Sequence, residues 1–304
     1  MKPHIYIFEP SSPSDRDTIC RAIDQLKGEF VLFGQISVKP FGPIGEPNPQ
    51  LPYLASSDEA KARLFAQLIS KCKKHSFILL SRGGYGSMRW IEKVELNRLA
   101  EDLDRVLFIG FSDATFLACK LLKLGHKFLH APMLSTYMTT SKKSRDALLE
   151  FLATGHLPKL EGNGLVSGIS KGKVVGGNLT CLCHTLGTRL EPDWTNRILF
   201  IEDCNEEIYR IDRMLTHLLH KGVLRQVEGI AVGSFILKDS EKANSEILQR
   251  MLEDRLAHLG KPLVFDLPAG HGERNYPILL GTEYVLDGTQ GSFQPVETYW
   301  RLGR

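Results

Sequence analysis

The sequence lacks the features that would assign it to a membrane, a secretory route or a nucleic-acid partner. No apolar run in its 304 residues approaches the roughly 20 residues that a membrane-spanning helix needs. The N-terminal stretch MKPHIYIFEP has neither the long apolar segment nor the small-residue cleavage site of a secretory signal. Basic and acidic residues number 38 and 35 and nearly cancel, whereas nucleic-acid-binding proteins usually carry a basic stripe or tail. We therefore expect a cytoplasmic protein that binds neither membranes nor nucleic acid.

Cysteine is also scarce, and its positions suggest neither a disulfide framework nor a metal site. The chain has six cysteines, too few for a framework in a protein of this length. Cys181, Cys183 and His184 lie in a predicted helix, where side chains two positions apart point in different directions. His126 and His130 lack the glutamate of an H-E-x-x-H motif, and we expect them to be core or strand residues. We expect no metal and no cofactor.

The chain does contain an alternation of short β-rich runs and amphipathic stretches, which is typical of parallel sheets covered by helices. The expected strands are 5–8, 76–80, 106–111, 173–177, 197–202 and the runs EGIAVGSF and PLVFDL. The expected helices are 15–26, a helix that begins at the capping-box serine Ser56, and 113–124, 144–153, 206–220 and 245–259. Residues 154–172 are rich in Gly, Pro and Ser without helical periodicity and are expected to form a linker. We expect an N-terminal domain over 1–153 and a C-terminal domain over 173–304.

The sharpest local feature is the pentapeptide GFSDA at 110–114, where a buried strand ends and a helix begins at once. Small residues two positions either side of Ser112 allow the tight turn of a nucleophile elbow, with Ala114 in place of the usual second glycine. Such a turn would expose Ser112 Oγ and direct the backbone N–H of Asp113 toward a developing oxyanion. For the pentapeptide alone, an ordinary N-cap serine is the alternative.

A glycine cluster, RGGYG at 82–86, directly follows the strand 76–80. Glycines at the end of a strand let the backbone approach a ligand closely, so the Gly84 N–H is a candidate second oxyanion donor. A plain tight turn and a phosphate-binding loop are the alternatives, although the stretch matches neither G-x-G-x-x-G nor a P-loop.

A nucleophilic serine needs a base and a group that orients the base. His271 follows the strand PLVFDL and is flanked by glycines, on a strand-end loop where catalytic residues of α/β folds concentrate. Glu202 ends the strand 197–202, and the order Ser112, Glu202, His271 matches that of α/β hydrolases. Three acidic residues on the same segment are rivals to Glu202: Asp203, Glu206 and Glu207.

Several short segments, taken in their order and spacing, resemble the LD-carboxypeptidase family of serine peptidases, which also includes the microcin-immunity peptidases. They are PSSP (10–13), RGGYG (82–86), GFSD (110–113), HAPM (130–133), GGNL (176–179), ED (202–203), YR (209–210) with Arg213, GHG (270–272) and LG (280–281). The resemblance implies an N-terminal α/β domain of Rossmann-like or flavodoxin-like type that carries the elbow. It also implies a C-terminal α/β domain that carries the acidic residue and the histidine.

By motif position, the resemblance assigns a role to each matching residue. Ser112 would be the nucleophile, Glu202 the acidic member of the triad and His271 the base. The backbone amides of Gly84 and Asp113 would form the oxyanion hole. Three further residues of the glycine cluster are candidates for substrate binding: Arg82, Gly83 and Tyr85.

The activity implied is removal of the terminal D-alanine from cytoplasmic muropeptide tetrapeptides during cell-wall recycling, by an enzyme that forms a homodimer. One alternative is a self-immunity peptidase that cleaves a peptide-nucleotide amide, because loops rather than motifs decide the substrate. The other is a catalytically silent protein whose strand-end cleft binds a ligand without cutting it.

Overall fold

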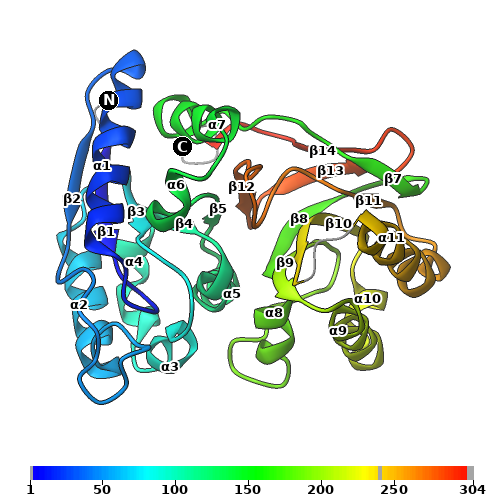
Figure 1. Ribbon diagram of the computed structural model, residues 1–304, viewed down its shortest axis with the longest axis horizontal. Coiled ribbons are helices and arrows are strands. Elements are labelled where there is room, and N and C mark those ends of the chain that lie inside the picture. The colour runs from blue at the N-terminus through cyan, green and yellow to red at the C-terminus, as the bar shows by residue number, and fades with distance from the viewer. Residues whose placement is uncertain (1–2, 239–241, 300–304) are drawn as a thin grey trace.

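The computed structural model describes residues 3–238 and 242–299 and shows two sheets side by side, each flanked by helices (Figure 1). The first sheet contains, in spatial order, β12 (Ile278–Leu280), β5 (Phe128–His130), β4 (Val106–Gly110), β3 (Ser76–Leu80), β1 (His4–Phe8) and β2 (Ser37–Pro40). All neighbouring pairs are parallel except β12 with β5. The order 2-1-3-4-5 of the parallel strands is that of flavodoxin-like sheets, so the expected fold class is confirmed.

Helices cover both faces of the first sheet. They are α1 (Arg16–Phe30), α2 (Asp58–Lys71), α3 (Ser87–Ile91), α4 (Ala100–Leu103), α5 (Thr115–Lys123), α6 (Leu134–Tyr137) and α7 (Lys142–Thr154), with short 3-10 turns η1 (Val31–Phe33), η2 (Leu96–Leu99) and η3 (Ser112–Ala114). Phe77 and Leu79 of β3 pack in the core with α1 and α7, whereas Ile78 and Leu80 pack in the core with α2 and α5. This alternation is the period of two that a strand buried on both faces requires.

The N-cap residue of α2 differs by one position from the prediction. The residue that caps α2 is Ser57, whose hydroxyl accepts a hydrogen bond from the Ala60 N–H at 3.2 Å. Ser56 has a φ of 62° and lies outside the helix, so the cap predicted at Ser56 is wrong by one residue. Two adjacent serines before the same acidic turn offer the same cap chemistry, and the local pattern does not distinguish them.

The second sheet contains, in spatial order, β6 (Leu160–Glu161), β14 (Ser292–Pro295), β13 (Glu283–Asp287), β8 (Ile169–Asn178), β9 (Arg197–Glu206), β10 (Gly229–Leu237), β11 (Leu263–Phe265) and β7 (Asn163–Val166). Its strands β8 to β11 are parallel. The helices of this half are α8 (Leu179–Thr185), α9 (Ile208–Lys221), α10 (Val223–Gln226) and α11 (Lys242–Leu256), with the turn η4 (Ala257–Leu259). Across the described ranges, no helix has the length and apolar character to cross a membrane.

The chain passes between the two halves more than once. Residues 154–172, which we expected to form a linker, contain β6, β7 and the first residues of β8, all in the second sheet. Later, β12 returns to the first sheet and pairs antiparallel with β5. The domain limits at 153 and 173 stay a prediction.

The packing of α2 predicts that a leucine-to-alanine substitution lowers stability far more at Leu68 than at Leu32. Leu68 of α2 is fully buried in the core of the first sheet, whereas Leu32 is 87% exposed. Leu68→Ala should lower the free energy of unfolding by about 2–5 kcal/mol because it removes buried methyl groups and leaves a cavity. Leu32→Ala should change it by about 0.5 kcal/mol or less. Equal losses in urea denaturation would contradict this packing.

Candidate active site

The loops that follow β1, β3 and β4 meet at the carboxyl edge of the first sheet. The strand order reverses between β1 and β3, and the crevice beyond such a switch point is the usual ligand site of an open α/β sheet. The loops after β1 and β3 are joined at this point. Ser12 N–H donates to the Gly83 carbonyl at 3.3 Å, and Tyr85 N–H donates to Ser12 Oγ at 3.1 Å. The glycine cluster at 82–86 is therefore held at the switch point.

Ser112 has the strained backbone of a nucleophile elbow. Its φ is 62°, in the left-handed region that non-glycine residues rarely occupy, and the preceding Phe111 is extended. The N-cap of the turn η3 is Phe111, so Ser112 is not the ordinary N-cap serine of the alternative reading. Strain of this kind is characteristic of functional sites, where the surrounding structure enforces it. Ser112 is only partly buried, so a ligand can reach it.

The glycine cluster lies directly against this serine. A Cβ atom added at Gly83 would be 3.0 Å from Ser112 Cβ and 3.1 Å from Ser112 Oγ, so no larger residue fits without moving the serine. Gly84 has a φ of 100°, and a side chain there would collide with Ser12. Within the described chain, the backbone N–H groups of Gly84 and Asp113 donate to no other backbone group.

The Asp113 side chain has a structural role that the sequence reading missed. Its buried carboxylate accepts hydrogen bonds from Ser11 Oγ at 2.5 Å and from Ser87 N–H at 2.8 Å. Burial raises the pKa of Asp113, and these hydrogen bonds partly offset that rise. Since Ser11 follows β1 and Ser87 follows the glycine cluster, one carboxylate ties the elbow to both neighbouring loops.

On the second sheet, Glu202 and His271 form a close contact. Glu202 Oε2 accepts hydrogen bonds from His271 Nδ1 at 2.6 Å and from the His271 backbone N–H at 3.0 Å. The Glu202 side chain is fully buried, whereas the His271 side chain is 17% exposed, so one face of the imidazole remains accessible. A Cβ atom at Gly270 would lie 2.7 Å from Glu202 Cβ, so this glycine makes room for the carboxylate.

The two groups shift each other's pKa in opposite directions. Burial alone would raise the pKa of Glu202, but the charge of protonated His271 and the neighbouring His130 lower it below the usual carboxyl range. Burial alone would lower the pKa of His271, but the Glu202 carboxylate outweighs this and raises it above the usual imidazole range. The carboxylate therefore stabilises an imidazolium, as the acidic member of a triad must.

Phe111 links the two halves of the site. Its ring lies against the His271 ring, with centroids 4.7 Å apart, and it directly precedes Ser112 in the chain. In the described residues no hydrogen bond joins Ser112 Oγ to the imidazole. Such bonds often form only in the complex with substrate. The structure thus pairs Glu202 with His271 and places the residue that precedes Ser112 against the same imidazole.

The rivals to Glu202 are engaged elsewhere. Asp203 accepts hydrogen bonds from Asn178 Nδ2 at 2.8 Å and from the hydroxyl and N–H of Thr180. Glu206 pairs with Arg210 at 3.7 Å and Glu207 with Lys238 at 3.6 Å. Among the four acidic residues considered, Glu202 is the one that contacts His271.

Two predicted substrate-binding residues, Arg82 and Tyr85, are exposed. Arg82 Nη1 donates to the Pro13 carbonyl at 2.7 Å. The Tyr85 side chain is half exposed and lies against Tyr53, with ring centroids 6.0 Å apart. The third, Gly83, is buried beneath Ser112 and offers only its backbone.

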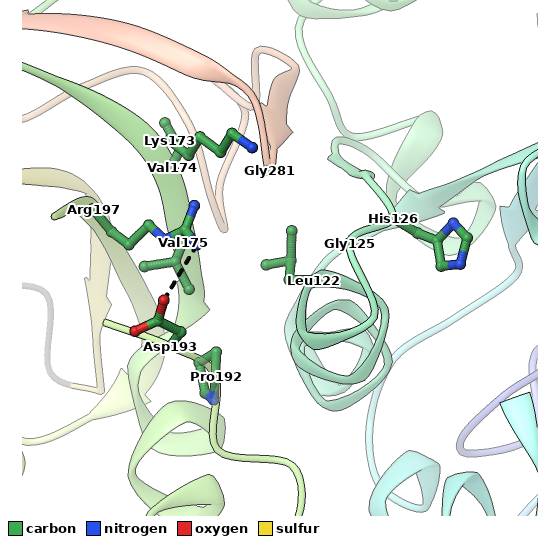
Figure 2. Close-up of a pocket in the computed structure, with 10 residues that line it drawn as sticks. All are labelled: Leu122, Gly125, His126, Lys173, Val174, Val175, Pro192, Asp193, Arg197 and Gly281. Atoms are coloured by element: carbon green, nitrogen blue, oxygen red, sulfur yellow. Dashed lines mark hydrogen bonds and ion pairs between the residues drawn. The ribbon is translucent and has the colours of Figure 1, made fainter. Parts of the chain in front are cut away.

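A separate hollow lies between the two sheets, at the opposite edge of the second sheet (Figure 2). Lys173 in the middle of β8 and its register partner Arg197 at the start of β9 line it, and Leu122 near the end of α5 lines its other side. Arg197 pairs there with Asp193 at 3.3 Å. None of the predicted site residues lines this hollow, so it is distinct from the candidate active site.

The two cysteines and the one histidine of α8 do not converge on a common point. The His184 ring contacts the Thr180 carbonyl at 2.7 Å, and Cys183 Sγ contacts the Met214 carbonyl. Over residues 3–238 and 242–299, no group of three or more His, Cys, Asp or Glu side chains could hold a metal ion.

Comparison with known proteins identifies the chain's relatives. Residues 5–131 match the LD-carboxypeptidase N-terminal domain, and residues 171–286 match the LD-carboxypeptidase C-terminal domain. The probable murein peptide carboxypeptidase of Bacillus subtilis is 32% identical over 92% of this chain and 88% of its own length.

Solved structures show the same fold. The muramoyltetrapeptide carboxypeptidase of Oxalobacter formigenes has a TM-score of 0.82 and 27% identity, covering 96% of this chain and 97% of its own. MccF in complex with glutamyl sulfamoyl guanosine has a TM-score of 0.79 at 20% identity, covering 98% of this chain and 96% of its own, and shares the fold alone. The two domain matches and the B. subtilis relative show that this chain belongs to the LD-carboxypeptidase family.

Proposed function

We propose that the protein is a serine LD-carboxypeptidase in which Ser112, His271 and Glu202 form the catalytic triad. The observation that carries this proposal is the 2.6 Å contact between His271 Nδ1 and Glu202, beside the Phe111 ring that directly precedes the strained Ser112. Family membership makes the protein a carboxypeptidase, and the triad supplies the chemistry that such hydrolysis needs.

The proposed reaction follows from the groups at the site. His271 Nε2 accepts the Ser112 proton as Oγ attacks the scissile carbonyl, while Glu202 holds the Nδ1–H tautomer and stabilises the imidazolium. The N–H groups of Gly84 and Asp113 stabilise the tetrahedral oxyanion, where one such donor contributes about 3 kcal/mol. The imidazolium then protonates the leaving amine, and water, activated by the same imidazole, hydrolyses the acyl-enzyme.

The substrate we propose is a muropeptide tetrapeptide, from which the enzyme removes the terminal D-alanine during cell-wall recycling in the cytoplasm. The murein peptide activity named for the B. subtilis and O. formigenes relatives supports this choice. Arg82 and Tyr85 are exposed on the loop that contains Gly83, the glycine packed against Ser112, and this supports the proposal that they contact the peptide. We further propose that the protein works as a homodimer without cofactor or metal, as the family resemblance implies.

The alternative substrate is a peptide-nucleotide amide of the microcin type. The likeness to MccF supports the shared fold, and a shared fold does not decide the substrate. A catalytically silent binding protein is the other alternative, but it would not need a strained serine beside a histidine–carboxylate pair.

A fluorophosphonate probe should label the protein at Ser112, because an activated serine attacks phosphorus as it attacks a carbonyl carbon. Peptide mapping by mass spectrometry locates the label. Ser112→Ala should abolish labelling, while Ser70→Ala, which removes an exposed hydroxyl from α2, should leave it unchanged. Persistent labelling of Ser112→Ala, or labelling at another serine, would rule out the proposed nucleophile.

The close approach of Gly83 to Ser112 predicts that a side chain at position 83 slows labelling of Ser112 by the fluorophosphonate. Gly83→Ala should slow labelling about tenfold, because the added methyl group, 3.0 Å from Ser112 Cβ, displaces the serine by a few tenths of an ångström. Gly28→Ala is the control, since a Cβ atom on this residue of α1 meets nothing within 4 Å. It should keep the wild-type labelling rate. A Gly83→Ala protein labelled as fast as wild type would contradict the geometry.

A further inference from the structure

His130 is a buried histidine without a hydrogen-bond partner. It ends β5, its exposed fraction is 1%, and neither ring nitrogen has a partner in the described part of the chain. Burial of an unpaired polar group is unfavourable by about 1–3 kcal/mol, so such a group usually has a function or gains a partner at another stage. An apolar residue would fill the same space without this penalty.

The nearest polar atom that also lacks a partner belongs to Glu202. Its Oε1 is fully buried, accepts no hydrogen bond within the described residues, and lies 3.9 Å from His130 Nε2. Oε2 of the same carboxylate accepts both hydrogen bonds from His271. Oε2 of Glu202 thus accepts two hydrogen bonds. Oε1 accepts none within the described residues and is separated from His130 Nε2 by slightly more than a hydrogen-bond distance.

Two aromatic rings fix the orientation of His130. Phe200 lies edge-on to the imidazole, with centroids 4.9 Å apart, and Phe111 lies 5.7 Å away. Phe111 also contacts the His271 ring. Both histidines therefore contact the same phenyl group, in apolar surroundings where a hydrogen bond to a carboxylate is strong.

The arrangement bears on a requirement of the proposed mechanism. A base must be neutral before it can accept the Ser112 proton, yet the Glu202 carboxylate raises the pKa of His271 and favours its protonated form. A donor on the second oxygen of Glu202 would draw negative charge away from His271. It would thereby lower the proton affinity of the base.

We propose that His130 is a positioning residue that donates a hydrogen bond from Nε2 to Glu202 Oε1, so that the carboxylate is shared between two imidazoles. The inference rests on the proposed roles of Glu202 and His271. Closure of the gap needs a movement of about 1 Å to reach hydrogen-bonding distance. Because His130 belongs to the first sheet and Glu202 to the second, the same bond would align the two halves of the site.

Other ionisable groups also face this pair and set the background for its titration. Asp203 adjoins Glu202 on β9, and its carboxylate is held by Asn178 and Thr180. Cys204 interacts with His271, and the charges of Asp113, Asp203 and Glu202, together with burial, raise the pKa of Cys181 on α8. The variants described next leave all of these groups unchanged, so a shift in titration reports the loss of the His130 donor.

The test is an NMR titration of the His271 imidazole in the wild-type protein, with the resonance assigned by loss of signal in His271→Ala. His130→Phe keeps the size and removes the donor, and it should raise the pKa of His271 by about one unit, because the carboxylate then acts on His271 alone. His130→Gln keeps an N–H donor and should stay near the wild-type value. If His130→Phe does not fold, His130→Leu removes the donor with a smaller side chain.

The inference would be overturned if the pKa of His271 were unchanged in both His130→Phe and His130→Leu. Equal shifts of the His271 pKa in His130→Phe and His130→Gln would also overturn it, because a merely structural role of His130 does not depend on a hydrogen-bond donor. The titration needs no turnover, so its outcome is independent of the nucleophile. Failure of a fluorophosphonate to label Ser112 would reject the proposed function, whereas labelled protein with an unmoved His271 would reject only the role of His130.

Discussion

A carboxylate with no exposed surface needs hydrogen-bond donors inside the protein, and the main donor to Glu202 is His271. One oxygen accepts both the ring N–H and the backbone N–H of that residue, so the carboxylate sets the position and the tautomer of the imidazole together. Gly270 lets the backbone of the histidine loop pass within contact of the carboxylate. The remaining features of the site serve to bring a serine to this pair.

The serine comes from the other sheet, so the site depends on how the two halves meet. The elbow at Ser112 is anchored to the loops after β1 and β3 through the Asp113 carboxylate. Across the seam, the Asn178 N–H donates to Thr115 Oγ1 at 3.0 Å, just after the elbow. The return of β12 to the first sheet adds a second physical link between the halves. These contacts explain how residues separated by about half the chain are held at one edge.

Much of this arrangement could be predicted from the sequence, because the strongest signals are local. The buried apolar runs mark the parallel strands, and small residues around Ser112 mark the elbow. Parallel strands carry their loops to one edge, which predicts that Glu202 and His271 lie near each other. The edge strands β6 and β7, and β14 next to β6, are short and partly exposed, so no run of apolar residues distinguishes them from loops. The sequence predicts a core or strand residue at His130, and its further role is inferred from the neighbouring Glu202 oxygen, which has no hydrogen-bond partner among the described residues.

The most direct test of the account is mass spectrometry of the purified protein incubated with L-Ala-D-Glu-meso-diaminopimelate-D-Ala, with Ser112→Ala in parallel. The wild-type protein should release one D-alanine, and Ser112→Ala should release none. Release by both proteins would contradict the role of Ser112. An intact tetrapeptide after incubation with wild-type protein that a fluorophosphonate labels would contradict the muropeptide substrate.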